Sequence, residues 1–212
     1  MDQSVEMIQR VHCERCKKAL EQNGFHVDIA SDAAEIQELV NMMIKDGDLV
    51  CDGGSMTLKE TGILDMLAKR NITFQSHNEP GLSREQSDEE ARKAFYADVF
   101  LASANAITWN GEIINVDGHG NRVSAMIFGP KKVILIVGVN KLVEDEAAAI
   151  RRIQTVAAPA NSVRLHKETP CVHVGLCQNC HSGDRICSSY VKLNYDKENR
   201  IHVILSLQPF GY

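Results

Sequence analysis

The stretch Lys132-Val-Ile-Leu-Ile-Val-Gly-Val139 has the length of a strand and contains no polar residue after its first position. Short apolar runs of this kind are typical of strands that are buried on both faces of a parallel sheet. The run is far shorter than the roughly 18 consecutive apolar residues that indicate a transmembrane helix, and the sequence has no longer one. We therefore expect residues 132–139 to form a buried strand of a globular protein.

On both sides of this stretch, segments with strand periodicity alternate with segments with helical periodicity. The pattern predicts further strands at residues 25–30, 48–51, 72–74, 98–103, 190–195 and 201–206. It predicts helices at residues 1–22, 57–69, 87–96, 121–128 and 144–157, and another that Asp32 caps. We expect Pro159 to end the helix at 144–157. The alternation predicts an α/β fold with a mainly parallel sheet flanked by helices.

The middle of the chain has a hairpin signal. Residues 107–109 and 112–114 have strand character, and Asn110-Gly111 lies between them. This dipeptide favours a type I′ turn, in which both central residues have positive φ.

Composition and charge exclude several classes of protein. The chain has 212 residues, of which 44% are apolar and 24% charged, so we expect one domain over residues 1–212 that includes a cysteine-rich segment at 170–189. The formal net charge of −5 argues against a broad nucleic-acid-binding face. The N-terminal residues lack the layout of a signal peptide, so the seven cysteines indicate a reducing compartment, and we expect a cytoplasmic protein.

A glycine-rich turn follows the predicted strand at 48–51. Gly53 and Gly54 let the backbone approach a ligand closely, and Ser55 and Thr57 add hydroxyl donors at the start of the next helix. Thr57 and Glu60 also have the spacing of a capping box. Ligands favour the carboxyl ends of α/β strands, so we predict an anion-binding turn here. The alternative is a plain strand-to-helix turn that needs glycine geometry.

Amide and charged side chains gather in the central glycine-rich region and after the buried strand at 132–139. The predicted ligand-binding residues of these segments are Asn105, Asp117, Asn121, Arg122, Asn140 and Lys141. An arginine binds a phosphate or carboxylate through two hydrogen bonds, so we expect Arg122 and Lys141 to flank one anionic ligand. The alternative is a set of hairpin turns with two surface cations.

Two carboxylates are the predicted catalytic residues. Glu60 lies in the helix that follows the glycine-rich turn, and Glu112 lies between the hairpin turn and two isoleucines. Either carboxylate would serve as a general base or a nucleophile. The alternative for Glu112 is an exposed position on the hairpin.

Four of the seven cysteines form the pattern Cys171-x5-Cys177-x2-Cys180-x6-Cys187. Two thiolates at Cys-x2-Cys spacing chelate one metal centre, and two more complete the four ligands of a zinc ion or an iron–sulfur cluster. The spacing matches neither paired zinc knuckles nor the ferredoxin pattern, so a cluster, zinc, free thiols and disulfides all stay open. Cys13 and Cys16 fall in a predicted helix with no second pair nearby, and we expect them to bind no metal.

Seven segments, taken in order, resemble the lactate-utilisation (LUD) domain family. They are Gly54-Ser-Met-Thr-Leu-Lys-Glu-Thr-Gly62, Ala97-Asp-Val-Phe-Leu-Ala-Ser-Ala-Asn-Ala-Ile-Thr108, Asn110-Gly-Glu112, Asp117-Gly-His-Gly-Asn-Arg122, Gly129-Pro-Lys-Lys-Val133, Gly138-Val-Asn-Lys141 and Ala158-Pro-Ala-Asn161. The tail resembles that of lactate-utilisation protein C-like members with a cysteine-rich C-terminal motif. The resemblance covers almost the whole chain.

The resemblance implies a fold similar to that of ribose-phosphate isomerases, glucosamine-phosphate deaminases and CoA transferases. Those proteins bind anionic substrates at the carboxyl ends of parallel strands. It also implies a role in lactate oxidation beside iron–sulfur oxidoreductase subunits. The expected partners are these subunits and an anionic small molecule with a phosphate or carboxylate, and a homo-oligomer is a further candidate. Nucleic acid and membrane are not expected partners.

Three hypotheses for function follow. The first is an oxidoreductase component or accessory in the oxidation of lactate or a related hydroxy acid, with the four cysteines of the tail holding an electron-carrying cluster. The second is an isomerase, transferase or hydrolase that acts on a sugar phosphate or an acyl-CoA, with Glu60 or Glu112 in the reaction and structural zinc in the tail. The third is a ligand-binding or assembly module without catalysis.

Overall fold

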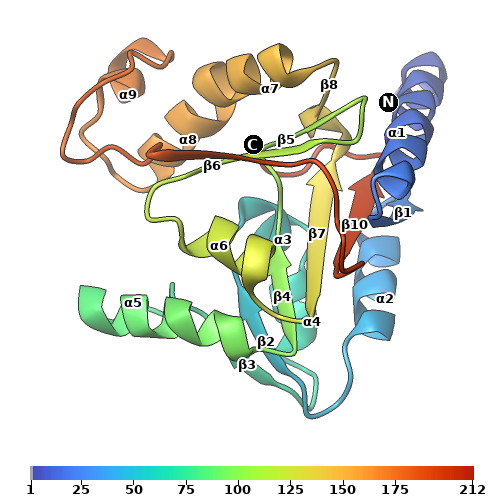
Figure 1. Ribbon diagram of the computed structural model, residues 1–212, viewed down its shortest axis with the longest axis horizontal. Helices are drawn as coiled ribbons and strands as arrows, with labels where there is room; N and C mark the ends of the chain where they lie inside the picture. Colours follow the sequence, from blue (N-terminus) through green and yellow to red (C-terminus); the bar gives the residue numbers. More distant parts are fainter. Residues whose placement is uncertain (1) are drawn as a thin grey trace.

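The computed structural model describes residues 2–212 and contains two sheets. The main sheet has six parallel strands in the order β1-β10-β7-β4-β2-β3 (Figure 1). These strands are β1 (His26–Ala30), β2 (Leu49–Asp52), β3 (Thr73–Gln75), β4 (Val99–Ala102), β7 (Lys132–Gly138) and β10 (Ile201–Ser206). The predicted α/β class with a mainly parallel sheet is confirmed.

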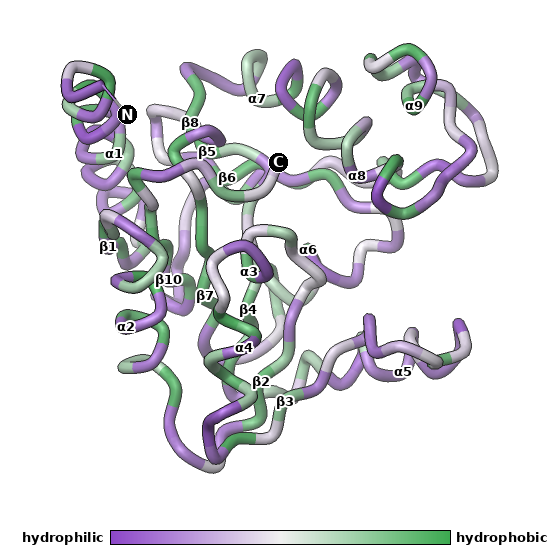
Figure 2. Tube along the Cα trace, turned by 180° about the vertical axis from the view of Figure 1, so that it is seen from behind, coloured by the Kyte–Doolittle hydropathy of each residue, from purple (hydrophilic) through white to green (hydrophobic). Residues whose placement is uncertain are grey.

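Helices cover both faces of the main sheet because its strands are apolar on both sides. In β7, Val133, Leu135 and Val137 join one buried cluster, and Ile134 and Ile136 join another. The first cluster includes residues of α1 (Gln3–Gln22) and α6 (Asn121–Phe128), and the second includes residues of α2 (Ala33–Met43), α3 (Met56–Glu60) and α4 (Ile63–Leu67). Figure 2 shows this apolar interior along β7 and β4. Burying one side chain of this size stabilises the folded state by about 1.5–3 kcal/mol. The two faces of the sheet are therefore a main source of the stability of the protein.

The second sheet lies near the end of the main sheet where β4 and β7 finish (Figure 1). It has four strands in the order β8-β5-β6-β9. They are β5 (Ala106–Thr108), β6 (Ile113–Asp117), β8 (Leu142–Val143) and β9 (Ser189–Leu193). The remaining helices are α5 (Arg84–Lys93), α7 (Glu146–Arg152), α8 (Ala158–Arg164) and α9 (Pro170–Val174), with short 3-10 or π turns at 94–96, 139–141 and 153–157. Within residues 2–212, no helix has both the length and the apolar character needed to cross a membrane.

Two predicted helices differ from the expectation. The helix expected at 57–69 divides into α3 and α4 because Gly62 between them has a φ of 70°. The helix expected to end at Pro159 continues, since a π turn connects α7 to α8. Pro159 lies in the first turn of α8, directly after the π turn, so the change in hydrogen-bond pattern coincides with the proline.

The hairpin between β5 and β6 forms, but its predicted type I′ turn is wrong. Gly111 has a φ of 76°, whereas Asn110 has no positive φ. The Gly111 N–H donates to the Thr108 carbonyl over 2.9 Å, which fits a type I turn followed by a left-handed glycine. A Cβ at Gly111 would lie 2.6 Å from backbone atoms of Ala19 and Leu20, so the hairpin tip packs directly on α1.

We predict that Gly111→Ala destabilises the protein by about 1–3 kcal/mol more than Gly47→Ala, because only the first adds atoms to a packed contact. Both glycines have positive φ, at 76° and 87°, but a Cβ at Gly47 meets nothing within 4 Å. Gly47→Ala therefore measures the conformational cost alone. Urea unfolding of the two variants tests the difference, and equal losses would show that the hairpin does not rest on α1.

Candidate functional site

A cavity of about 360 Å³ lies among the loops that follow β2, β3, β4, β6 and β7, with α5 and α8 as further walls. This volume suits a small metabolite. The cavity brings together nine of the ten predicted ligand-binding residues. They are Gly53, Gly54, Ser55, Thr57, Asn105, Asp117, Asn121, Arg122 and Lys141. The tenth, Asn140, lies outside.

The glycine-rich turn after β2 forms one edge of the cavity. Gly54 has a φ of 69°, and its N–H donates to the Asp52 carboxylate over 3.0 Å. A Cβ at Gly53 would lie 2.9 Å from Cγ of Arg122, so glycine is needed for close packing. Ser55 is the N-cap of α3 but makes no side-chain cap bond. The predicted capping box is therefore wrong, because Thr57 lies inside the helix, where its hydroxyl contacts other parts of the cavity.

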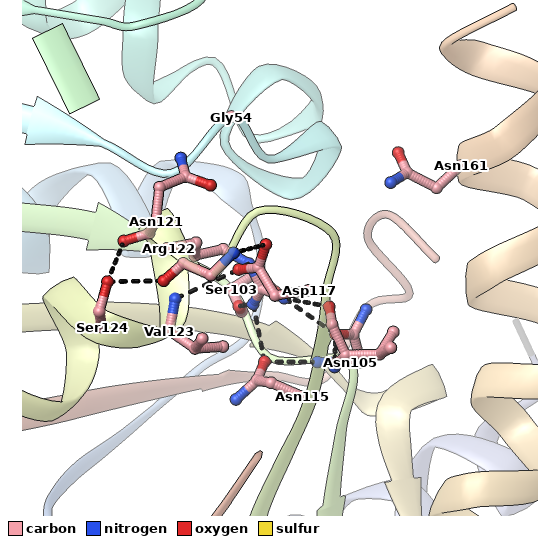
Figure 3. A network of polar contacts seen from close by, with 12 residues as sticks. Gly54, Ser103, Asn105, Asn115, Asp117, Asn121, Arg122, Val123, Ser124 and Asn161 are labelled. Atoms are coloured by element: carbon pink, nitrogen blue, oxygen red, sulfur yellow. Dashed lines mark hydrogen bonds and ion pairs between the residues drawn. The ribbon is translucent and has the colours of Figure 1, made fainter. Parts of the chain in front are cut away.

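Arg122, in the first turn of α6, is the centre of a hydrogen-bond network (Figure 3). Its Nη1 donates to the Ser103 carbonyl over 2.9 Å and to Asn115 Oδ1 over 2.7 Å. Its Nη2 donates to Asn105 Oδ1 over 3.0 Å and to the Val116 carbonyl over 2.9 Å.

The remaining donor of the Arg122 guanidinium, Nε, lies 3.6 Å from Asp117 Oδ2. Four of the five N–H groups of the guanidinium therefore donate hydrogen bonds within the protein, and the fifth forms part of an ion pair with Asp117. This geometry opposes the predicted two-bond contact between Arg122 and a ligand anion. It gives Arg122 a structural role, since it joins α6 to the loop after β4 and to β6.

Lys141, unlike Arg122, is a buried cation with few partners. Its side chain follows β7, is only 2% exposed, and lines the cavity. The Nζ atom lies 2.9 Å from Thr57 Oγ1 and 3.0 Å from Ser103 Oγ. Among the described residues no carboxylate lies within ion-pair distance of it.

The pKa of Lys141 falls to about 7, first because burial penalises the charged form. The positive charges of Arg152 and Arg122 lower this pKa further, and the carboxylate of Glu60 raises it. Lys141 is therefore a buried amine that changes charge near neutral pH.

The side chains that line the cavity carry a surplus of positive charge. Five cations and two carboxylates are among them: Arg84, Arg122, Lys141, Arg164 and Lys167 against Asp88 and Asp117. The whole chain has a net charge of −5, so the cavity has the opposite sign to the rest of the molecule. A concave site of this sign attracts anions.

Sequence reasoning missed several residues of the cavity. His77, Asn78 and Arg84 come from the loop and helix after β3, a segment with no predicted site residue. Asn161 of α8 lies across from Gly54 and Asn121 in Figure 3, and its Oδ1 accepts from Nε of Arg164 over 3.0 Å. Asn161 belongs to one of the seven segments that resemble the LUD domain family, and this resemblance was a signal that could have identified it as a site residue. His77, Asn78 and Arg84 had no such signal, because only the folding of the chain brings them beside the other cavity residues.

Three predicted site residues lie outside the cavity. Asn140 binds the last residues of the chain through its amide, which donates to the Gly211 carbonyl over 2.9 Å. Glu60 accepts from the Gly211 N–H over 2.6 Å, and its charge raises the pKa of Lys141. Glu112 accepts from Thr108 Oγ1 and pairs with Lys192, 3.3 Å away, on the hairpin. The structure therefore does not bring Glu112 to the cavity.

The four cysteines of the tail lie in two environments. Cys171 is buried in α9, where its Sγ lies 3.2 Å from Thr169 Oγ1 and 3.7 Å from Ser162 Oγ. Cys177, Cys180 and Cys187 lie in the loop after α9 and are half-buried.

Arg185 organises this loop, because its guanidinium donates to the carbonyls of Cys180 and Cys187 over 2.6 and 3.0 Å. Burial raises the pKa of Cys187, Arg185 opposes this rise, and Cys177 and Cys180 add to it through their negative charge. Within residues 2–212, no three His, Cys, Asp or Glu side chains are grouped as metal ligands. As placed, the thiols do not fit one coordination sphere, and the four-cysteine site stays a prediction.

We predict that Arg122→Met lowers the free energy of unfolding by about 3–5 kcal/mol, because it leaves buried carbonyl, amide and carboxylate oxygens without donors. Arg151→Met, on the exposed side of α7, is the control and is expected to change stability by less than about 0.5 kcal/mol. Urea unfolding provides the measurement. Equal stabilities of the two variants would contradict the structural role of Arg122.

We predict that serine at Cys177, Cys180 or Cys187 lowers the iron or zinc content of anaerobically reconstituted protein, because each loss opens a coordination sphere. Serine at Cys13 or Cys16 is expected to leave it unchanged, since burial raises the pKa of both thiols to about 12. Metal and acid-labile sulfide analysis distinguish zinc from a cluster.

A parallel Cys171→Ser variant shows whether the buried thiol is the fourth ligand. Wild-type protein that binds neither metal after reconstitution would contradict the metal site.

Comparisons with known proteins agree with the geometry. Among solved structures, a DUF162 family protein from Deinococcus radiodurans is similar at 15% identity and a TM-score of 0.55, with 93% of this chain and 98% of that chain covered; this likeness shows the fold alone. The delta subunit of eIF2B from Chaetomium thermophilum, with 18% identity, a TM-score of 0.37 and coverage of 56% of this chain and 50% of that chain, is too distant to carry an argument. A comparison with curated proteins found no match. Residues 13–206 match the family model described as LUD domain, and the chain therefore belongs to the LUD domain family.

Proposed function

We propose that the cavity binds a small carboxylate-bearing metabolite of the lactate type, either a 2-hydroxy acid or the 2-oxo acid formed from it. The chain would act in the oxidation of such acids as an oxidoreductase component or accessory. The observation that carries this proposal is the buried amine of Lys141, which lines a cationic cavity and has no carboxylate partner among the described residues. Membership of the LUD domain family, which is linked to lactate utilisation, supports the choice of acid.

The charge of the cavity favours this class of ligand. Burying an ammonium group without a counter-charge is costly, and a carboxylate from a ligand would offset that cost. The hydroxyls of Thr57 and Ser103, each about 3 Å from Nζ, keep the amine in place until the ligand arrives. Asp117 does not compete for it, because its carboxylate lies beside Arg122 and accepts from backbone N–H groups.

The family resemblance supplies the proposed partners. Oxidation of a hydroxy acid releases two electrons, which need an acceptor. We propose iron–sulfur oxidoreductase subunits for this role, and the segment 170–189 as the candidate position of a cluster or a zinc ion in this chain. No step of the ligand binding described above depends on that metal.

A phosphate-bearing ligand is the second candidate. Arg84, Arg164 and Lys167 line the same cavity as Lys141, and together they would balance a phosphate. This favours a sugar phosphate or an acyl-CoA and corresponds to an isomerase, transferase or hydrolase.

We predict that Lys141→Met weakens the binding of L-lactate and of oxamate, a stable analogue of pyruvate, at least tenfold, because it removes the counter-charge of the carboxylate. Lys131→Met is the control, since Lys131 is exposed and lies outside the cavity. Calorimetric titration with L-lactate, oxamate and ribose 5-phosphate measures the affinities. Tight binding of ribose 5-phosphate alone would favour the second candidate, and equal affinities in the two variants would contradict the role of Lys141.

We also predict that oxamate affinity falls as the pH rises through about 7, the value to which burial lowers the pKa of Lys141. Below this pH the amine is charged and attracts the carboxylate, and above it the attraction is lost. The Lys141→Met variant is expected to lose this step in the pH profile. A wild-type profile that is flat between pH 6 and 8.5 would contradict the electrostatic role of the lysine.

A further inference from the structure

We propose that Lys141 is a catalytic amine whose nitrogen attacks the ketone carbon of a 2-oxo acid in the cavity and forms a Schiff base with it. This rests on the proposed function, because the acid must first bind. Three features of the described residues carry the proposal: the burial of the amine, its hydrogen-bond partners and the lack of an ion pair.

The two hydroxyl partners fix the direction of the amine. Thr57 Oγ1 lies 3.3 Å from the Phe210 carbonyl, and Ser103 Oγ lies 3.3 Å from the Ala104 carbonyl. Carbonyl oxygens only accept hydrogen bonds, so each hydroxyl has a carbonyl to donate to while it accepts from Nζ of Lys141, and Thr57 Oγ1 also lies 3.3 Å from Ser103 Oγ. A neutral amine has two N–H groups, and these two acceptors use both. The lone pair takes part in neither of these two hydrogen bonds, and it belongs to a side chain that lines the cavity.

The surroundings favour the neutral, nucleophilic form of the amine. Lys141 is 2% exposed, and the nearby cations Arg122 and Arg152 oppose its protonation, so its pKa lies near 7. Desolvation beside other cations is a general way to activate a lysine for Schiff-base formation. Lys167 also lines the cavity, but it lies 3.7 Å from Asp184 and its side chain is 36% exposed. Lys167 therefore has the carboxylate partner and the access to solvent that Lys141 lacks.

The reaction needs no reagent beyond the acid and a proton. The Nζ lone pair forms a bond to the ketone carbon, and the electron pair of the carbonyl π bond moves to oxygen. Transfer of one amine proton to that oxygen gives a carbinolamine. A second proton from solvent or from a nearby acid then lets the oxygen leave as water, and the C=N bond forms.

Reductive trapping tests the proposal. The full chain is incubated with saturating pyruvate and sodium cyanoborohydride, which delivers a hydride to the C=N bond, and the modified lysine is identified by peptide mapping. We expect the N-(1-carboxyethyl) group on Lys141 in at least tenfold excess over Lys167. With pyruvate kept saturating at each pH to offset its weaker binding, the yield is expected to rise with pH through about 7 as the amine becomes neutral. Oxamate, whose amide carbonyl forms no Schiff base, is expected to block the modification.

Two variants complete the design. Lys141→Arg keeps a positive charge but has no nucleophilic amine, so we expect it to bind oxamate and to trap no pyruvate. Lys131→Met is expected to trap pyruvate like the wild type, since Lys131 is exposed outside the cavity.

The outcomes separate this proposal from the proposed function. Oxamate binding without trapping at Lys141 overturns the Schiff base but leaves the binding site in place. Equal modification of Lys141 and of exposed lysines also overturns it, because the reaction is then unselective. Failure of both binding and trapping overturns both proposals.

Discussion

The guanidinium of Arg122 holds together the parts of the molecule that form the cavity. Four of its N–H groups donate to backbone carbonyls and asparagine side chains of the loop after β4 and of β6, and its Nε pairs with the carboxylate of Asp117. Buried donors and acceptors must be satisfied, so this one side chain fixes the distance between the loop that carries Ser103 and the strand that ends at Asp117. The shape of the cavity follows from that distance.

This arrangement gives two buried cations different tasks. Arg122 donates four hydrogen bonds within the protein and pairs with Asp117, so it stabilises the fold and adds positive potential to the cavity. Lys141 has only two hydroxyls as partners, and it lacks a carboxylate partner among the described residues. A buried charge that a protein leaves unpaired is characteristic of a functional site, because the ligand supplies the missing partner. Burial, and after it the positive charges of Arg152 and Arg122, lower the pKa of this amine to about 7.

Most of the strands and helices could be predicted from the sequence, because each depends on a local pattern of apolar and polar residues. The apolar run at 132–139 and the flanking strands follow from periodicity, and nine of ten predicted ligand-binding residues reach one cavity since loops after parallel strands share an edge. The predictions that failed concern positions that are determined by contacts between segments far apart in the sequence. The turn at Asn110-Gly111 is set by its packing against α1, and Glu112 is held on the hairpin by Lys192. Likewise, no local pattern shows that the guanidinium of Arg122 bonds within the protein while Lys141 has no ion pair among residues 2–212.

A crystal structure of the full chain with oxamate tests the central claim most directly. The claim is that the buried amine of Lys141, held by Thr57 and Ser103, provides the counter-charge of a bound small acid. We predict oxamate in the cavity with an oxygen within hydrogen-bond distance of Nζ of Lys141, while the contacts of Arg122 to Asn105, Asn115 and Ser103 stay unchanged. Oxamate bound to Arg122 in place of those contacts, or bound only outside the cavity, would contradict it.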